Sequence, residues 1–352
     1  MGTVSNGNIE GQLTGELPAK FYFSKINNYI PVQKNYSIEN IESISDKTKL
    51  PATIFIPKSI KRSAAIIMMF GSGTHNKEEF YGFADMFASN GIATLVYDKR
   101  NVTGDNYPNL NITRTGSDIV LMQDLVDDAK GAFEYLKKRK EINPNKIGLW
   151  GISQGGMVAP MLIANNPDIA FVVIVSAPTT VLKECYHFQK LNRLKNRIAD
   201  VNTIQKVENL WAEFDNYIIN GSDLNELKPM LDKAYAEGWG QLTTIPQKLP
   251  TKDDLKYNFG YNTLGLDPST YWVKTNVPTY AVYGEGDIQV PVNKSIEAIK
   301  LAFLNKENLL TIKTYQNADH LIKSIPNRNN FDFPKYAQGY LSDMILWILK
   351  QQ

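Results

Sequence analysis

Residues 146–160 read KIGLWGISQGGMVAP, an apolar run that passes through two glycines around a serine into a segment with helical character. The run Ile147–Trp150 predicts a strand and Gln154–Asn165 predicts a helix, so Ser153 falls at the turn between them. Such a turn strains the backbone, and the flanking glycines omit the side chains that would keep strand and helix apart. The hydroxyl of Ser153 is then exposed at the carboxyl end of a strand, where open α/β sheets bind ligands.

The sequence around this stretch alternates between two patterns. Short runs of β-branched and apolar residues, typical of strands covered on both faces, are separated by longer segments with apolar residues at helical spacing. This alternation predicts an α/β fold with a mostly parallel sheet and helices on both faces. The predicted strands are Ala64–Phe70, Ile92–Tyr97, Ile147–Trp150, Phe171–Val175, Thr279–Tyr283 and Leu309–Tyr315.

Helices are expected between these strands and after the last of them. They are predicted at Phe80–Asn90, Asp118–Lys140, Gln154–Asn165 and Tyr336–Leu349. Upstream, the segments Tyr36–Ser45 and Leu50–Pro57, separated by a turn-like DKTK, predict an antiparallel hairpin at one edge of the sheet.

The chain is expected to divide into three parts. Residues 1–35 form an N-terminal extension, and residues 36–178 with 273–352 form the α/β core. Residues 179–272 are an insert, because roughly a hundred residues separate two strands that a dozen or so could connect. The insert is helical in pattern up to about Gly238 and rich in aromatic residues. We expect a mainly helical cap, whose aromatic residues form a small core of their own, face the substrate, or do both.

A serine hydroxyl becomes a good nucleophile only when a base removes its proton, so Ser153 calls for a histidine with an acid behind it. The sequence has three histidines. His320 follows the last predicted strand and precedes a polar loop, the position that a base at a neighbouring strand end would occupy. For His75 and His187 we expect no catalytic role.

The acid should orient the imidazole and stabilise its protonated form. Asp287 leaves the strand Thr279–Tyr283 through two glycines and is the expected acid, with Glu285 as the alternative. The oxyanion hole should use the backbone N–H of Gln154, directly after the nucleophile, and one from the loop Gly71–Asn76. Ser72 is the expected second donor, with Gly73 as the alternative.

Four motifs resemble those of the α/β-hydrolase superfamily, and more narrowly a bacterial branch of esterases, acyl-thioesterases and dipeptidyl-peptidase-like serine hydrolases. They are Phe70-Gly71-Ser72-Gly73, Tyr97-Asp98-Lys99-Arg100-Asn101, Gly151-Ile152-Ser153-Gln154-Gly155-Gly156 and Gly284-Glu285-Gly286-Asp287-Ile288-Gln289-Val290-Pro291. The resemblance covers roughly residues 50–178 and 275–350, and the chain order Ser153, Asp287, His320 agrees with it. Phe70 departs from the family's histidine before the oxyanion glycine, and Asn101 from its glycine.

The residues and the resemblance together predict a serine hydrolase, most directly a carboxylesterase that acts on small or medium acyl esters through an acyl-enzyme on Ser153. An acyl-thioesterase or an exopeptidase of the same fold is the alternative, since fold alone does not choose among these reactions. A hypothesis of a different class is a non-catalytic binding protein that keeps the hydrolase fold. The predicted chemistry calls for no metal and no organic cofactor.

The composition bears on which classes of binding partner are expected. Lys and Arg number 38 against 36 Asp and Glu, a net charge of +2, and no basic stripe marks a nucleic-acid surface. The apolar runs are far too short to cross a bilayer, so we expect neither nucleic-acid partners nor membrane insertion. Cys185 is the only cysteine and is expected to be a buried, inert thiol. The expected location is cytoplasmic by default, or secreted or periplasmic if the polar N-terminus follows a removed signal peptide.

Overall fold

The structure is a computed structural model that describes residues 2–5, 8–13, 19–23, 33–44, 49–100, 121–221, 224–251, 259–324 and 334–351. Three features predicted from the sequence fall wholly or partly outside these residues. They are most of the turn between the two hairpin strands, the position of Asn101, and the first residues of the helix expected from Asp118.

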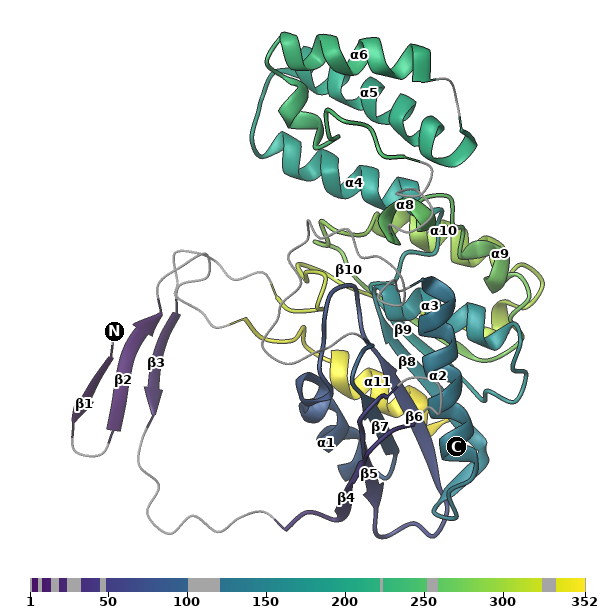
Figure 1. Ribbon diagram of the computed structural model, residues 1–352. Helices are drawn as coiled ribbons and strands as arrows, with labels where there is room; N and C mark the ends of the chain where they lie inside the picture. Colours follow the sequence, from purple (N-terminus) through teal and green to yellow (C-terminus); the bar gives the residue numbers. More distant parts are fainter. Residues whose placement is uncertain are drawn as a thin grey trace.

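An eight-stranded sheet forms the centre of the protein (Figure 1). Its strands in spatial order are β11 (Leu310–Tyr315), β10 (Thr279–Gly284), β9 (Val172–Val175), β8 (Ile142–Ile152), β6 (Ser63–Met69), β7 (Ala93–Tyr97), β5 (Ala52–Pro57) and β4 (Tyr36–Ile41). The first six are parallel to one another, whereas β5 is antiparallel to both β7 and β4. The predicted strands and edge hairpin are therefore confirmed.

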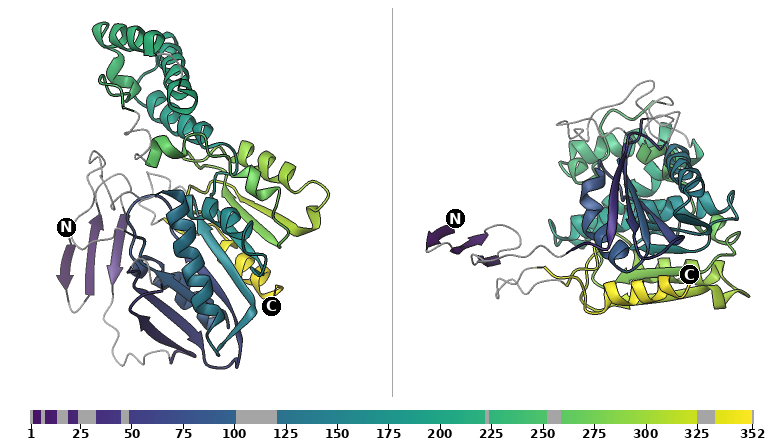
Figure 2. Two further views of the ribbon diagram at one scale, coloured as in Figure 1. Left: turned by 45° about the vertical axis from the view of Figure 1, so that its right-hand side comes forward. Right: turned by 90° about the horizontal axis from the view of Figure 1, so that it is seen from below.

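Helices cover both faces of this sheet, and two apolar clusters separate them from it (Figure 2). One face carries α2 (Met122–Lys137), α3 (Gln154–Ile163) and α10 (Val292–Ala302), and the other carries α1 (Tyr81–Ser89) and α11 (Tyr340–Leu349). Successive residues of β6 alternate between the clusters, with Ile67 on the first face and Ile66 and Met68 on the second. A strand buried on both sides has no polar face, which is why it reads as a continuous apolar run.

Two helices begin later than the periodicity predicts. The segment from Phe80 starts with a 3₁₀ turn, η1 (Lys77–Phe80), before α1 begins at Tyr81. At the C-terminus α11 begins at Tyr340 rather than at Tyr336, because Gly339 precedes it with a φ of 87°, which an α-helix cannot contain. None of the described helices is both long and apolar enough to cross a membrane.

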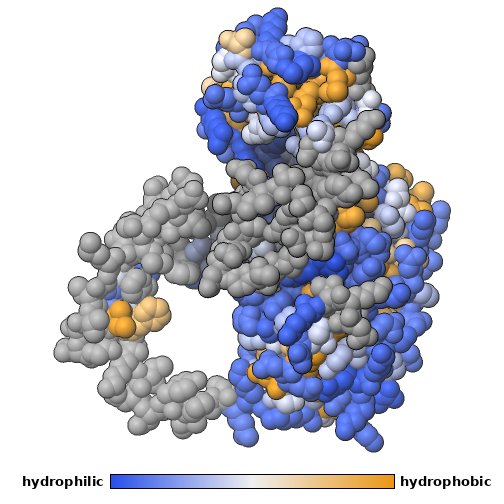
Figure 3. Space-filling model, viewed as in Figure 1, coloured by the Kyte–Doolittle hydropathy of each residue, from blue (hydrophilic) through white to orange (hydrophobic). Residues whose placement is uncertain are grey.

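The segment between β9 and β10 is largely helical. It contains α4 (Leu182–Lys195), α5 (Val201–Asn220), α6 (Leu224–Ala236), the short η3 (Gly240–Thr243), α8 (Phe259–Thr263) and α9 (Ser269–Trp272). Helices α5 and α6 with η3 enclose a third apolar cluster around Trp211, Phe214 and Leu231. On the face shown in Figure 3, hydrophobic residues gather within this upper helical unit, while hydrophilic residues dominate the surface around the sheet.

Three short strands near the N-terminus form a separate antiparallel sheet. They are β1 (Gly2–Ser5), β2 (Asn8–Leu13) and β3 (Ala19–Phe23), and Figure 1 shows them to one side of the main sheet. No strand was expected within residues 1–35. The signal was present in β2, where Ile9, Gly11 and Leu13 alternate with polar residues.

Candidate active site

Ser153 occupies the junction of β8 and α3. Its backbone has φ 52° and ψ −116°, a conformation that residues with a Cβ rarely adopt and that costs roughly 1–3 kcal/mol. The surrounding chain holds it there: the Ser153 N–H donates to the Val175 carbonyl at 2.8 Å, and its own carbonyl accepts from the Gly156 N–H at 3.0 Å. The strained turn predicted from the sequence is present.

Three glycines around the serine leave no room for a side chain. A Cβ at Gly151 would lie 2.4 Å from the Gly155 carbonyl oxygen, and one at Gly155 would lie 2.3 Å from the Met69 carbonyl oxygen. A Cβ at Gly156 would lie 2.4 Å from the Cβ of Ala177. All three distances are below 3.0 Å, so side chains here would push α3 away from the sheet.

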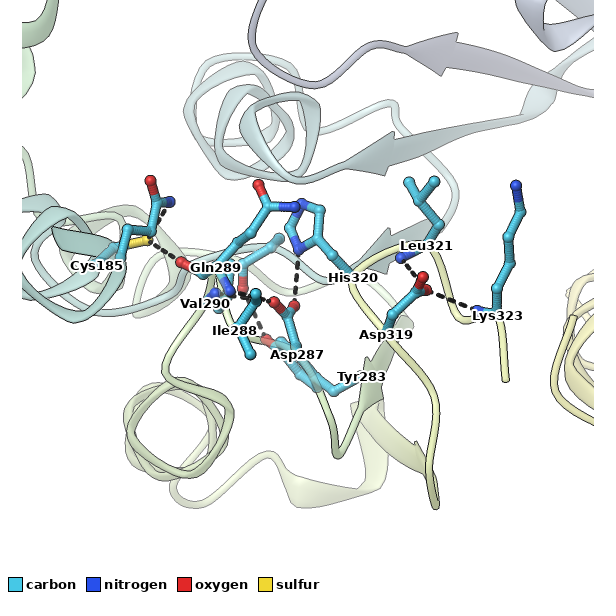
Figure 4. A network of polar contacts seen from close by, with 12 residues as sticks. Cys185, Tyr283, Asp287, Ile288, Gln289, Val290, Asp319, His320, Leu321 and Lys323 are labelled. Atoms are coloured by element: carbon cyan, nitrogen blue, oxygen red, sulfur yellow. Dashed lines mark hydrogen bonds and ion pairs between the residues drawn. The ribbon is translucent and has the colours of Figure 1, made fainter. Parts of the chain in front are cut away.

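His320 and Asp287 form a hydrogen-bonded pair in the loops that follow β11 and β10 (Figure 4). The His320 Nδ1 lies 2.7 Å from the Asp287 Oδ2, and the carboxylate side chain is fully buried while the imidazole keeps 12% exposure. The other oxygen, Oδ1, accepts from the backbone N–H groups of Gln289 at 2.7 Å and Val290 at 3.1 Å. These bonds fix the carboxylate, which in turn fixes the ring and leaves Nε2 available to a substrate.

The loop that carries His320 is held by its own side chains and by a close approach to β10. Asp319 Oδ1 accepts from the N–H groups of Leu321 and Lys323, each at 2.9 Å (Figure 4). A Cβ at Gly284 would lie 2.3 Å from the Asp319 carbonyl oxygen, so this glycine permits the two loops to touch. The position of the imidazole is therefore determined by backbone packing as well as by Asp287.

The alternative acid and one of the other histidines lie elsewhere. Glu285 is exposed and accepts a hydrogen bond from Thr314 Oγ1 at 3.0 Å, so it does not face His320. His187 belongs to α4 and contacts Glu208 at 3.1 Å. Asp287 is therefore the acidic residue that the structure brings to His320.

A cavity of about 320 Å³ brings three of the predicted site residues together, while Gln154 is not among the residues that line it. Ser153, His320 and Ser72 all line it. Six aromatic residues contribute to its wall, namely Phe70, Phe80, Phe83, Trp150, Tyr336 and Tyr340. No group of three or more His, Cys, Asp or Glu side chains that could hold a metal ion occurs among the described residues.

The wall of this cavity does not come from the insert. Among the described residues, those that line it belong to segments 70–83, 150–153 and 289–340. Insert aromatics such as Trp211, Phe214 and Tyr217 pack in the insert's own apolar cluster. The cap over Ser153 stays a prediction.

The loop after β6 is braced by His75, for which we expected no catalytic role. One ring nitrogen, Nε2, bonds the Ser72 carbonyl at 2.9 Å, and the other contacts Glu79 Oε2 at 2.8 Å. The ring stacks on Phe70 with centroids 5.1 Å apart, and Phe70 stacks in turn on Phe80 at 4.0 Å. Phe70, which departs from the family pattern, thus takes part in an aromatic stack that supports the loop.

One further side chain, that of Lys99, approaches this loop and was not identified from the sequence. The Lys99 ammonium group donates to the Gly71 carbonyl and to the side-chain Oε1 of Gln154. The available signal was a lysine just after a buried strand, in the YDKR motif, at the edge of the sheet that carries Ser153. Cys185, in contrast, is buried as expected, and burial raises the pKa of its thiol to about 12.

A mostly parallel sheet with a strained serine after β8, an acid after β10 and a histidine after β11 is the arrangement of the α/β-hydrolase fold. Residues 61–213 match the family described as serine aminopeptidase, S33.

Individual proteins are also similar to this chain. Esterase EstD from Thermotoga maritima is 22% identical over 287 residues, which cover 78% of this chain and 58% of that protein. The quorum-quenching protein AidA from Acinetobacter baumannii is 26% identical over 134 residues, 38% of this chain and 42% of that protein. The chain thus matches less than two thirds of the length of these curated relatives. A solved esterase from Pyrococcus furiosus has a TM-score of 0.51 at 14% identity, covering 93% of this chain and 94% of that one.

Proposed function

We propose that the protein is a serine hydrolase, and most directly a carboxylesterase for small or medium acyl esters. One observation carries the proposal. Ser153, on a strained turn, lines the same cavity as His320, whose second ring nitrogen is held by the buried Asp287. A protein that only bound ligands would have no physical need for these three residues in this arrangement.

The reaction follows from the positions of these groups. Ser153 Oγ attacks the ester carbonyl while His320 Nε2 takes the hydroxyl proton, and Asp287 stabilises the imidazolium that forms. The developing oxyanion accepts hydrogen bonds from the backbone N–H groups of Gln154 and Ser72. His320 then protonates the leaving alcohol, and a water molecule activated by the same base hydrolyses the acyl-enzyme.

The cavity supports a small or medium acyl group. Its volume of about 320 Å³ is near the lower end of the roughly 300–1,000 Å³ found for ligand sites. Six aromatic side chains contribute to the wall, and this apolar surface favours an apolar acyl or alkoxy group over a charged one.

The same cavity favours an ester over a peptide with a free amino terminus. An aminopeptidase needs a free carboxylate for the substrate ammonium group. Within the described residues, Glu79 is the one carboxylate of the cavity wall, and its oxygens already contact His75 Nδ1 and the Asn76 N–H. Thioesters share the acyl chemistry and are distinguished by assay.

The test compares wild type with Ser153→Ala and with Ser89→Ala, an exposed serine on α1 that serves as the control. Substrates are p-nitrophenyl acetate, butyrate and octanoate, a matched thioester, and an aminoacyl p-nitroanilide. We expect ester hydrolysis in wild type and Ser89→Ala and a loss of several powers of ten in Ser153→Ala. Ester hydrolysis that survives in Ser153→Ala would exclude the proposed nucleophile.

A fluorophosphonate probe separates the enzyme from a non-catalytic binding protein. Stoichiometric labelling of the folded wild type, absent in Ser153→Ala and retained in Ser89→Ala, supports an activated serine at the turn between β8 and α3. A folded wild type that neither reacts with the probe nor hydrolyses any of the substrates would instead be a binding protein with this fold.

A further inference from the structure

Lys99 is a cation placed behind the loop that follows β6. It lies two residues after β7, and its Nζ donates to the Gly71 carbonyl at 2.5 Å and to Gln154 Oε1 at 2.7 Å. Desolvation of this ammonium group lowers the pKa of Lys99 to about 7. Burying an ammonium group costs free energy, and its hydrogen bonds do not by themselves make the folded protein more stable. The position of Lys99 therefore calls for a functional reason.

The planarity of the peptide bond connects Lys99 to the candidate oxyanion hole. The carbonyl of Gly71 and the N–H of Ser72 belong to one peptide unit, and in a trans peptide they point in opposite directions. No cis peptide occurs among the described residues. By holding the carbonyl on its own side, Lys99 directs the Ser72 N–H away from itself, and Ser72 lines the cavity that also contains Ser153.

The second contact of Lys99 reaches the residue that carries the other candidate donor. Gln154 is largely buried, with 9% exposure, and its side-chain oxygen accepts from Lys99 while its backbone begins α3. One ammonium group therefore fixes both residues whose N–H groups are expected to bind the oxyanion. Glycine at position 71 leaves this peptide free to rotate unless something holds it.

The other charged groups around Lys99 have partners of their own. On its own segment, Asp98 pairs with Lys77 at 3.6 Å, and Arg100 pairs with Asp124 and Asp128 of α2. In the loop after β6, His75 pairs with Glu79. Lys99 lines a small cavity of about 20 Å³ together with Asp128 and the phenol of Tyr97.

We propose that Lys99 is a positioning residue of the oxyanion hole, which orients the Gly71–Ser72 peptide, places a positive charge behind the Ser72 N–H, and holds the side chain of Gln154. The proposal rests on the serine-hydrolase function proposed above. In the tetrahedral intermediate the negative charge forms on the substrate oxygen, and Lys99 stabilises it through the polarised Gly71–Ser72 peptide.

The test is Lys99→Met, which keeps the length of the side chain and removes its donors and charge. We expect kcat to fall about 10- to 100-fold with KM changed less than about threefold, since the oxyanion forms only after substrate binds. A boronic acid that mimics the tetrahedral intermediate should bind more weakly by a similar factor. The melting temperature should change little, because removal of the desolvated charge offsets the loss of its hydrogen bonds to the Gly71 carbonyl and Gln154 Oε1.

Two variants serve as controls. Lys99→Arg keeps charge and donors, with the neighbouring cavity to receive extra atoms, and should recover kcat to within about tenfold of wild type. Lys306→Met removes another lysine that donates to backbone carbonyls, those of Val273 at 2.7 Å and Thr275 at 2.6 Å, and should lower stability without changing kcat. If Lys99→Met does not fold, Lys99→Leu replaces it in the same comparison.

The outcomes separate this inference from the proposed function. Wild-type activity that Ser153→Ala abolishes and Lys99→Met leaves unchanged would overturn only the role of Lys99. The same holds if Lys99→Met raises KM as much as it lowers kcat, or weakens boronic acid binding no more than product binding. If wild type neither hydrolyses esters nor reacts with fluorophosphonate, both proposals fall.

Discussion

Replacing Asp287 by Asn gives the sharpest test of the acid–base pair. The carboxylate makes three bonds, one from Oδ2 to His320 Nδ1 at 2.7 Å and two from Oδ1 to the N–H groups of Gln289 and Val290. An asparagine oxygen in the place of Oδ1 keeps the two backbone bonds. Its amide then faces Nδ1 as a donor, so the ring must carry its proton on Nε2 and can no longer accept one from Ser153.

This tautomer change predicts a large loss of activity with a small loss of stability. In a Ser-His-Asp triad the equivalent change lowers kcat by about 10⁴-fold, which corresponds to about 5 kcal/mol of transition-state stabilisation. Asp287→Ala should differ in stability, because it leaves two buried backbone donors unpaired at about 1–3 kcal/mol each. The Asn and Ala variants should therefore resemble one another in kcat and differ in melting temperature.

The assay is p-nitrophenyl butyrate hydrolysis with thermal unfolding measured on the same preparations. Glu285→Gln is the matched control, since Glu285 is exposed and bonds Thr314, and we expect its kcat within about twofold of wild type. A folded Asp287→Asn variant with more than about a tenth of wild-type kcat would refute the assignment. A Glu285→Gln variant that lost activity in its place would make Glu285 the acid.

Three further changes have defined outcomes. Gly155→Ala places a Cβ 2.3 Å from the Met69 carbonyl oxygen and should cost roughly 1–3 kcal/mol or more in urea unfolding, whereas Gly82→Ala, with open space around it in α1, should be neutral or stabilising by up to about 1 kcal/mol. Phe83→Ala widens the cavity and makes room for two more methylene groups of the acyl chain, each worth about 0.8 kcal/mol of transfer free energy. The ratio of kcat/KM for octanoate to kcat/KM for acetate should therefore rise by about tenfold. An unchanged ratio would place the acyl group elsewhere. Burial lowers the pKa of Lys99 to about 7, below the ~10.4 of an unfolded chain, so folding is penalised below pH 7 and the penalty is relieved as pH rises towards 10. The free energy of unfolding of Lys99→Met minus that of wild type should therefore be largest near pH 6 and decrease by pH 10. An equal difference at both pH values would contradict a buried charge.

The central sheet was predictable because its strands are buried on both faces. Every residue of β6 is buried, so its sequence is an almost continuous apolar run. This run has the length of a strand and is too short for a typical buried helix. Strand β8 is different: it extends from Ile142 to Ile152, but its first half contains polar residues at the sheet's rim, and only Ile147–Trp150 was detected. The strands of the N-terminal sheet are short, and β2 repeats its alternation over only six residues.

The candidate site divides in the same way between what topology fixes and what loop conformation decides. Parallel strands end at one edge of the sheet, so residues that follow β8, β10 and β11 had to come near one another. The contact of Asp287 with His320 agrees with the sequence prediction for that reason. His75 and Lys99 contact the backbone carbonyls of Ser72 and Gly71. Every residue has a backbone carbonyl, so the sequence does not indicate which one a side chain will contact.

The charges of the site lie at its two ends, and this arrangement suits the reaction we propose. During acylation a negative charge grows on the substrate oxygen, and a positive charge grows on His320 as it takes the serine proton. The buried carboxylate of Asp287 stands behind the imidazole, and the ammonium group of Lys99 stands behind the peptide of the expected oxyanion donor. Both charges are fixed by hydrogen bonds before substrate arrives, so neither has to reorganise as the transition state forms. If this is the source of the rate, Asp287→Asn and Lys99→Met should each lower kcat far more than they raise KM, because each charge opposes one that exists only in the transition state.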